Sequence, residues 1–496
     1  MYGRRVKVTT RARGIASGTR RALILAPRRR CARSYRDGGT DAHARDRMRA
    51  LILVRAAACC ALILAAAAVV KTDGNQWRRP QRPLATSRGW STTGCPCSNA
   101  SLCAPIQRPG PEKVYAFHVD ASTNGSNADW RSFDWSQIST LCLYGSLSPE
   151  LLCHAHAHGV RITLGDGGTG YDFTDKAAHA WINRTVERVQ SMHVDGINID
   201  LEINNCSGRI GNCDNPDGWS SEAMANLTRH TAALTTALHA AVPGSHVSFD
   251  TPSLGLYEEG ADGRGCGYMY GRNYDFKGLA DAADFLLVMD YDSNDPALNG
   301  TFNKTGQYNG GYNPWRWPGK GPFASSGQGY ANAGLGVIAQ GVECYRKLGV
   351  PTSKLVMAFP WYSYNYQCED RGAGELPPPV GAADDDWCRV VNASIINIDG
   401  AESVAIRQRI MADAIGGVRW NNKTGTPYLY YKAVPGAWDA GRIHRLDFDN
   451  PHSLALKAAY AKSVGARGVG AWTCDIIDYS NTALATAYWD SFKAFT

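Results

Sequence analysis

The sequence predicts an α/β protein built on a TIM (β/α)8 barrel, with a small α+β insertion between strands seven and eight. Eight short segments rich in Val, Ile and Leu alternate with helical stretches along the chain. Strands that alternate with helices pair in parallel with right-handed crossovers, and eight such units close a barrel. The connection between Tyr362 and Gly468 is about 105 residues long, which leaves room for a separate unit.

The expected strands are apolar runs bounded by turn-forming residues, which is typical of the buried strands of a parallel sheet. Helices with a 3.6-residue periodicity lie between them, at residues 149–159, 175–192 and 221–242. Asn450 as a cap and Pro451 at the first helical position open the helix before the last strand. In chain order the expected strands cover residues 114–119, 139–145, 160–165, 196–202, 246–252, 284–292, 354–362 and 468–474.

The long connection is expected to fold as an α+β insertion over residues 365–447. Within it, residues 427–434 and 442–450 have the alternating aromatic and apolar composition of strands. The acidic stretch at 382–388 is expected to be a solvated loop.

The amino-terminal leader has two parts. Residues 1–47 are basic and are expected to be disordered or to extend the gene model upstream of Met48. Residues 48–72 are expected to be a signal peptide, because the apolar run after Arg55 is short for a membrane span of ~20 residues. An uncleaved anchor and a transit peptide are the alternatives. The folded domain is expected at 95–496, with no stable membrane association after signal cleavage.

The charge balance excludes one class of partner. Residues 1–70 hold 16 Lys/Arg and 3 Asp/Glu, which leaves 36 basic and 42 acidic residues in the remainder. The folded part is therefore mildly acidic, although the whole chain carries a formal charge of +7. No nucleic acid is expected as a partner.

The cysteines indicate an oxidising compartment. Outside the leader there are 12, an even number that permits full pairing. The stretch CPCSNASLC (95–103) lacks a neighbouring His and the paired spacing of a zinc site, so disulfides are expected there and a metal is not. Cys206 and Cys213 are candidates for a short disulfide loop. Sequons for Asn-linked glycans occur at Asn99, Asn124, Asn183, Asn205, Asn226, Asn299, Asn303, Asn392 and Asn422.

The fourth expected strand has polar residues at alternate positions. In HVDGINIDLEINN (193–205), Asn198, Asp200 and Glu202 share one strand face, which points into the barrel if the apolar face packs on the helices. Burying two carboxyl groups without partners would cost several kcal/mol, a cost usually retained for function. Glu202 would sit at the carboxyl-terminal mouth, where barrel active sites lie. Asp200, ~7 Å deeper, would share a proton with it and keep Glu202 acidic. The alternative is a polar ladder that only fixes strand register.

These residues carry a family resemblance. DGINIDLE (195–202) resembles the signature strand of glycoside hydrolase family 18, usually Asp-Gly-x-Asp-x-Asp-x-Glu, and departs from it at Asn198. FDWSQI, DFLLVMDYD, LVMAFPWYSYNY and GVGAWTCDIIDYS are also similar to motifs of that family, in the same order. The resemblance runs from about Cys95 to the carboxyl terminus.

The resemblance implies a role for each matching residue. Glu202 would be the general acid/base, Asp200 would orient the substrate and exchange the proton, and Tyr291 would hold the substrate's N-acetyl group. Asn198 would be a partner of Asp200. The remaining substrate-binding positions would be Met289, Asp292, Tyr362 and Trp472, the last as a floor for a sugar ring.

The resemblance also implies an activity. This is substrate-assisted, retaining hydrolysis of the β-1,4 bond between two N-acetylglucosamines, from the reducing end of the core of Asn-linked glycans. N-acetylglucosamine oligosaccharides would be the partners, with no cofactor, in a monomeric lysosomal or secreted enzyme. The alternatives are a chitinase acting on longer oligomers and a non-catalytic lectin.

Two other motifs are not expected to carry chemistry. HAHAHG (154–159) spaces its histidines so that the three do not all share one helix face, which favours a surface role over a metal site. GDGGTG (165–170) is not followed by Lys-Ser/Thr, so it is not expected to bind phosphate. Its Gly167 and Gly168 are similar to a family glycine pair after strand three.

Overall fold

The structure of the protein is a computed structural model. It describes residues 94–107, 110, 112–119, 129–202, 221–254, 274–292, 331–370, 372, 374–380, 387–388, 390–400, 404–433 and 440–496. The expectations for 1–47, for 48–72 and for the pair Cys206 and Cys213 fall outside these residues. Among the helices that are described, none is both long and apolar enough to cross a membrane.

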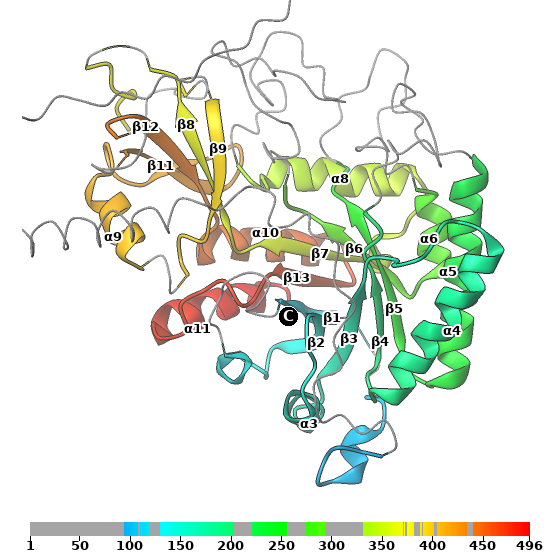
Figure 1. Ribbon diagram of the computed structural model, residues 1–496. Coiled ribbons are helices and arrows are strands. Elements are labelled where there is room, and N and C mark those ends of the chain that lie inside the picture. Colours follow the sequence, from blue (N-terminus) through cyan, green and yellow to red (C-terminus); the bar gives the residue numbers. More distant parts are fainter. Residues whose placement is uncertain are drawn as a thin grey trace, which may run out of the picture. The chain divides into compact units, whose positions relative to one another are not determined.

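Eight parallel strands close the predicted barrel, in the order β1-β13-β7-β6-β5-β4-β3-β2 (Figure 1). Every expected strand is present, and the α/β barrel prediction is confirmed. Five strands end one to three residues earlier than expected, and the largest difference is in β4 and β6, where ladder pairing stops before the polar residues that follow. The strands are β1 (Glu112–Val119), β2 (Ile138–Tyr144), β3 (Arg161–Asp166), β4 (Gly196–Ile199), β5 (His246–Pro252), β6 (Phe285–Met289), β7 (Leu355–Pro360) and β13 (Gly468–Trp472).

Helices cover the outside of the barrel, with α4 and α5 side by side and α10 against α11 (Figure 1). Asn450 caps α10 as predicted: its side chain accepts from the Ser453 amide, and the Ser453 hydroxyl accepts from the Asn450 amide. The helices are α3 (Pro149–Ala157), α4 (Asp175–Ser191), α5 (Ser221–Ala241), α6 (Phe276–Ala282), α8 (Leu335–Lys347), α10 (Pro451–Ser463) and α11 (Thr482–Ser491).

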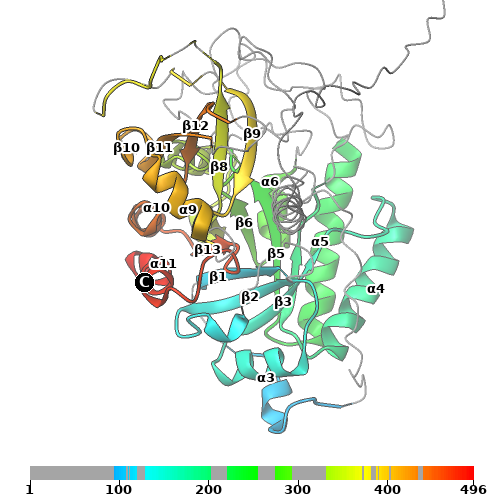
Figure 2. The same ribbon diagram turned by 60° about the vertical axis from the view of Figure 1, so that its left-hand side comes forward.

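The expected α+β insertion is present between β7 and β13 (Figure 2). It contains a five-stranded antiparallel sheet in the order β10-β11-β12-β8-β9, and its first strand follows β7 almost directly. The disulfide Cys368–Cys388 joins the end of that strand to the next segment. The elements are β8 (Ser363–Cys368), β9 (Val390–Ile396), α9 (Val404–Ala412), β10 (Arg419–Asn421), β11 (Thr426–Lys432) and β12 (Ile443–Asp447).

The cysteines of the amino-terminal stretch form disulfides, as predicted. Cys95 pairs with Cys103 and Cys97 with Cys153, which ties this stretch to α3. Full pairing, which the even count permitted, is not reached, because Cys142 and Cys474 are buried free thiols. These two side chains therefore act as small apolar groups of the barrel.

The surface role predicted for the three histidines of HAHAHG (154–159) is wrong for His156. This side chain is buried: its Nε2 lies 2.9 Å from Asp195 Oδ2, and its Nδ1 lies 2.6 Å from the Leu102 carbonyl oxygen. The error arises because α3 packs on the barrel with a face that includes position 156. The histidine satisfies a buried carboxylate at the amino-terminal end of β4.

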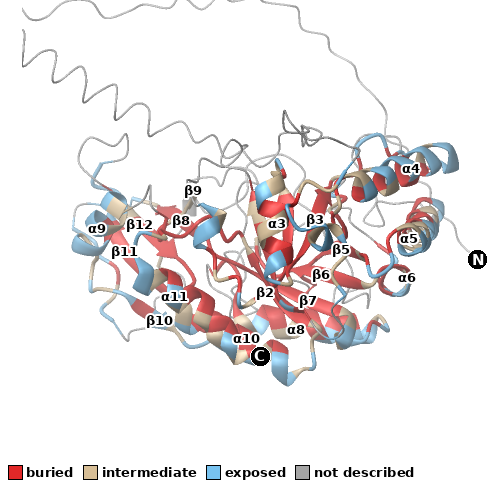
Figure 3. Cartoon of the chain, turned by 90° about the horizontal axis from the view of Figure 1, so that it is seen from below, coloured by how far each residue is buried: buried red, intermediate tan, exposed pale blue. Residues whose placement is uncertain are grey.

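The core has two compartments. Side chains that point outward from the strands pack against the helices and form the larger apolar cluster. Figure 3 colours the barrel strands, and parts of the helices that cover them, as buried. Side chains that point inward form a second, aromatic cluster, which includes Tyr115 and Phe117 of β1 and Phe285 of β6. The Tyr115 hydroxyl lies 3.0 Å from Thr163 Oγ1 and 3.2 Å from Ser248 Oγ, so the barrel interior also holds a polar layer.

Candidate active site

Asn198 lies at the centre of a buried hydrogen-bond network inside the barrel. Its Nδ2 donates to Ser248 Oγ at 2.9 Å and to Asp250 Oδ1 at 2.6 Å, and its Oδ1 accepts from the Tyr144 hydroxyl at 2.9 Å. The amide uses both protons and its oxygen, so its orientation is fixed by its partners. The network links β2, β4 and β5 directly below the carboxyl-terminal mouth of the barrel.

Three carboxyl groups gather above and around this amide. Asp250 is 3% exposed, Asp200 is half-buried and Glu202 is exposed. Burial raises the pKa of Asp250 well above its usual value, and the nearby charges of Asp200 and Glu202 raise it further. Hydrogen bonds from Asn198 and Tyr144 oppose this rise. Burial therefore disfavours the charged form of the carboxyl group in the floor of the site, while Asp200 and Glu202 lie nearer solvent.

Asp200 and Glu202 lie beyond the end of β4, which was expected to include them. One further bond continues the pairing, from the Asp200 amide to the Asp166 carbonyl oxygen at 2.9 Å. After this bond β3 turns away, so Glu202 leaves the ladder and reaches the surface. This exposure gives Glu202 access to a ligand at the mouth.

The turn after β3 shapes the backbone next to these carboxyl groups. Asp166 Oδ1 accepts from the Gly168 amide at 2.8 Å, and its Oδ2 accepts from Trp181 Nε1 at 3.2 Å. Gly168 has φ +69°, and a Cβ atom at this position would lie 2.2 Å from Leu201 Cδ1. Leu201 separates Asp200 from Glu202 in the chain, so the turn fixes the segment that carries both carboxyl groups. Asp166 has a structural role here.

Aromatic rings form one wall of the mouth. Trp472, at the end of β13, stacks on Tyr291 with ring centroids 5.9 Å apart and planes 21° apart. Phe117 and Tyr144 meet the same indole edge-on, at 5.0 and 5.6 Å. Trp472 is only half-buried, so part of its surface remains open to a ligand. Tyr291 is buried, and burial together with the charges of Asp250 and the other carboxyl groups raises the pKa of its hydroxyl well above the usual value.

A second group of tyrosines holds Asp292 at the start of the segment after β6. The Tyr362 hydroxyl donates to Asp292 Oδ1, and Tyr364 donates to the same oxygen at 2.5 Å. The Asp292 amide donates to Asn332 Oδ1 at 2.7 Å, in a left-handed backbone conformation with φ 56°. Asp292 thus connects the segment after β6 to the insertion. Met289, the last residue of β6, is buried.

The structure brings the sequence-predicted residues to one end of the barrel. The residues that follow β4 and β6, and Trp472 at the end of β13, meet there because the strands are parallel. The predicted partnership of Asn198 with Asp200 stays a prediction, since the network above runs to other groups.

Sequence reasoning missed Asp250, together with Ser248 and Tyr144. A signal existed in β5: HVSFDTP places Ser248 and Asp250 on one strand face, the same alternation that marked β4.

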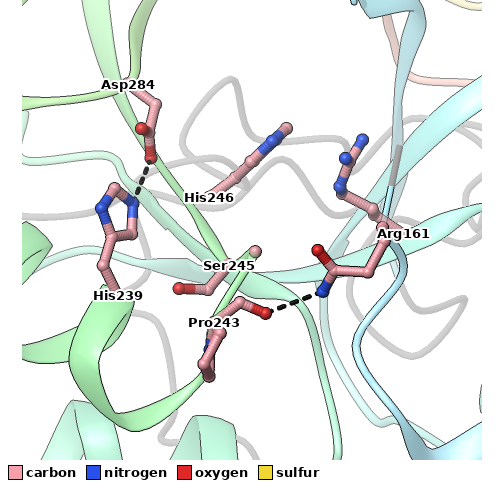
Figure 4. Close-up of a pocket in the computed structure, with 8 residues that line it drawn as sticks. Arg161, His239, Pro243, Ser245, His246 and Asp284 are labelled. Atoms are coloured by element: carbon pink, nitrogen blue, oxygen red, sulfur yellow. Dashed lines mark hydrogen bonds and ion pairs between the residues drawn. The ribbon is translucent and has the colours of Figure 1, made fainter. Parts of the chain in front are cut away.

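A separate pocket of about 520 Å³ opens at the opposite, amino-terminal end of the strands (Figure 4). His239 and Asp284 meet on one side of it, 3.1 Å apart, and Gln107 donates to the Pro243 carbonyl oxygen at 2.9 Å. Barrel enzymes place their chemistry at the other end, so this pocket is not part of the candidate active site. Its lining residues are Gln107, Arg161, His239, Pro243, Gly244, Ser245, His246 and Asp284.

Carboxyl groups gathered among aromatic rings at the carboxyl-terminal end of a parallel barrel characterise the glycoside hydrolases, which need an acid beside a flat sugar-binding surface. Comparison with known families agrees, because the family described as Glycosyl hydrolases family 18 matches residues 116–476. The chain belongs to this family and is a glycoside hydrolase.

Individual relatives give the same assignment. The chain is 31% identical to di-N-acetylchitobiase from Rattus norvegicus over 402 residues, which are 80% of this chain and 90% of the rat protein. It is 30% identical to di-N-acetylchitobiase from Homo sapiens over 400 residues, 79% and 86% of the two chains. A family 18 chitinase from Cycas revoluta, solved in complex with (GlcNAc)4, superimposes with a TM-score of 0.51 at 16% identity, over 76% of this chain and 99% of the other. This last likeness supports the barrel fold.

Proposed function

We propose that the protein is a retaining glycosidase that hydrolyses the β-1,4 bond of N,N'-diacetylchitobiose in the cores of Asn-linked oligosaccharides, acting from the reducing end. The observation that carries this proposal is the arrangement at the end of β4, where an exposed Glu202 follows Asp200 beside the stacked rings of Tyr291 and Trp472. The similarity to two di-N-acetylchitobiases supports this choice of substrate.

The proposed reaction is substrate-assisted, so it needs one protein acid and no protein nucleophile. Glu202 donates its proton to the glycosidic oxygen, and the acetamido oxygen of the same sugar attacks the anomeric carbon as the leaving sugar departs. Asp200 accepts a hydrogen bond from the acetamide N–H and balances the positive charge of the cyclic intermediate. The Glu202 carboxylate then takes a proton from a water molecule as the water oxygen attacks the anomeric carbon. This attack breaks the bond between that carbon and the acetamido oxygen and restores the original configuration.

The remaining residues hold the substrate in this proposal. Tyr291, kept protonated by its surroundings, donates to the acetamide oxygen and aligns it for attack. The open part of Trp472 forms the floor for the sugar ring. Asp292, fixed by Tyr362, accepts from a substrate hydroxyl, and Met289 fills the space beneath the acetamide.

The disulfides support a location in the secretory pathway, lysosomal or extracellular, since disulfides persist in oxidising compartments. The proposed partners are N-acetylglucosamine oligosaccharides, and a monomer suffices because the proposed site is built from one chain.

The test is release of N-acetylglucosamine from N,N'-diacetylchitobiose between about pH 4 and pH 7, for the wild type and for Glu202→Gln. Loss of a general acid lowers kcat by ~10²–10⁴-fold, while binding of the disaccharide should persist. Glu222→Gln, an exposed glutamate on α5, is the matched control and should leave the rate unchanged.

Substrate choice separates the alternatives. A chemically reduced disaccharide should resist a reducing-end enzyme, and its cleavage at a similar rate would contradict that direction of action. Preference for longer chitin oligomers would identify a chitinase. Binding of the disaccharide by the wild type without any hydrolysis would identify a lectin and overturn the proposal.

A further inference from the structure

Asp250 is a carboxyl group in the floor of the site for which the proposed mechanism has no use. It lies on β5, inside the barrel, and shares a 2.6 Å hydrogen bond with Asn198, 52 residues away in the chain. Asn198 occupies the deepest of the three alternating positions after the start of β4, and an amide there cannot release or accept a proton. Asp250, which is 3% exposed, is therefore the most buried carboxyl group of the cluster.

We propose that Asp250 is a positioning residue of the hydrolytic reaction, which stores the proton that Asp200 takes up and releases during turnover. This inference rests on the proposed function. The proton moves between two carboxyl oxygens of the same cluster, so no other reactant is required. When Asp250 holds the proton, Asp200 is an anion that can face the acetamide; when the proton returns to Asp200, the negative charge moves into the floor.

The hydrogen-bond pattern places the stored proton on one particular oxygen. Asn198 Nδ2 donates to Asp250 Oδ1, so this oxygen acts as an acceptor. The single hydroxyl proton of Tyr144 has a nearer acceptor in Asn198 Oδ1, at 2.9 Å, than in Asp250 Oδ2, at 3.4 Å. Asp250 Oδ2 thus receives only the longer of the two contacts of the Tyr144 hydroxyl, and it is the oxygen on which we place the stored proton.

The surrounding charges favour a single negative charge on the pair. Ile199 lies opposite Phe249 where β4 pairs with β5, so Asp200 and Asp250 are the next residues of two neighbouring parallel chain segments. The charges of Asp200 and Glu202 both raise the pKa of Asp250. The other ionisable groups that interact electrostatically with Asp250 are all neutral when protonated. They lie on β1, on β2 and just after β6. Two carboxyl groups in such an environment resist ionising together, so one of them keeps a proton. These other groups are Tyr115 on β1, Cys142 and Tyr144 on β2, and Tyr291 after β6.

A purely structural role is the competing explanation, since Asp250 also links β5 to β4. Three variants separate the two roles. Asp250→Asn keeps the shape and the hydrogen-bonding capacity but removes the titratable proton. Asn198→Asp with Asp250→Asn moves the carboxyl group across the 2.6 Å hydrogen bond and restores one titratable group. Asn198→Asp alone places a second carboxyl group against the first.

Hydrolysis of N,N'-diacetylchitobiose would be followed as a function of pH for each folded variant. Asp250→Asn should lower kcat by ~10–100-fold with KM changed less than about threefold, and should narrow the pH range of high kcat. Asp200 and Asp250 share a proton, which lowers the first of the two apparent pKa values of the pair. Without Asp250 this lower pKa rises, so the pH range of high kcat becomes narrower. The double variant should recover kcat to within about fivefold of the wild type, together with the wider pH range. Asp290→Asn is the matched control: it also alters a buried barrel aspartate, but one that interacts electrostatically with Lys457 and not with Asp200 or Glu202. It should leave the dependence of kcat on pH unchanged.

Each result decides between the roles. A folded Asp250→Asn with wild-type kcat and pH range would overturn the inference, as would a double variant no better than Asp250→Asn alone, because only a structural link would then be lost. If Asp250→Asn does not fold, Asn198→Asp alone should still shift the acidic or the alkaline limb of the plot of kcat against pH. An unshifted plot would overturn the inference. A wild type that releases no N-acetylglucosamine would instead overturn the proposed function, a result distinct from either outcome for Asp250.

Discussion

Replacing Gly168 by Ala tests how tightly the turn after β3 holds the carboxyl-bearing segment. Gly168 has φ +69°, and an added Cβ would lie 2.2 Å from Leu201 Cδ1, a separation that real Cβ atoms essentially never show. Leu201 is 1% exposed, so it cannot swing into solvent to relieve the overlap. Gly159 provides a matched control, because it has φ +68° with nothing within 4 Å of an added Cβ.

The expected loss in the free energy of unfolding has two parts. A side chain in the left-handed region costs roughly 1–2 kcal/mol at either glycine. Overpacking a filled site adds about 1–3 kcal/mol at Gly168 alone. Gly168→Ala should therefore destabilise by ~2–5 kcal/mol and Gly159→Ala by only ~1–2 kcal/mol. Because Leu201 lies between Asp200 and Glu202, a shift of about 1 Å there should also lower kcat by as much as ~100-fold.

Thermal unfolding and chitobiose hydrolysis measure the two effects on the same preparations. Gly168→Ala should melt at least about 2 °C below Gly159→Ala, and only Gly168→Ala should lose activity. Equal melting temperatures for the two variants would refute the argument from the Leu201 contact. An unstable Gly168→Ala with unchanged kcat would show that the carboxyl groups do not depend on this turn.

Two further predictions concern buried carboxyl groups, Asp290 just after β6 and Asp449 just before α10. Burial raises the pKa of Asp290 from 3.8 to about 7. Since the folded-state pKa is the higher one, the stability that Asp290 contributes is present below about pH 4 and is lost as the pH rises toward 7, by roughly 4 kcal/mol in all. Asp290→Asn should flatten this slope in denaturant titrations, and a slope that stays the same would contradict the assignment. Asp449→Ala should destabilise by about 3–5 kcal/mol, because it leaves the buried Lys457 Nζ, 2.6 Å from both carboxylate oxygens, without its counter-charge. A measured loss below about 1 kcal/mol would mean that water reaches the ammonium group.

The errors of the sequence analysis are concentrated at strand ends and at single buried polar residues. β4 and β6 end sooner than expected because the polar residues that follow them keep the alternating pattern while the ladder stops. His156 was expected at the surface, because sequence spacing does not reveal which helix face meets the barrel. Asp250 was missed because one acid in an apolar strand does not reveal its partner on another strand.

Hydrophobic periodicity and strand alternation are local properties of a linear chain, so they predict the eight barrel strands, the place of the insertion and the carboxyl groups after β4. No local pattern shows that Asp250 and Asn198 are joined by a 2.6 Å hydrogen bond across 52 residues, that Trp472 stacks on Tyr291, or that Cys142 and Cys474 remain thiols. The physical reason is that closure of the barrel sets the register between strands, and register between segments distant in sequence depends on how all eight strands and their helices pack together.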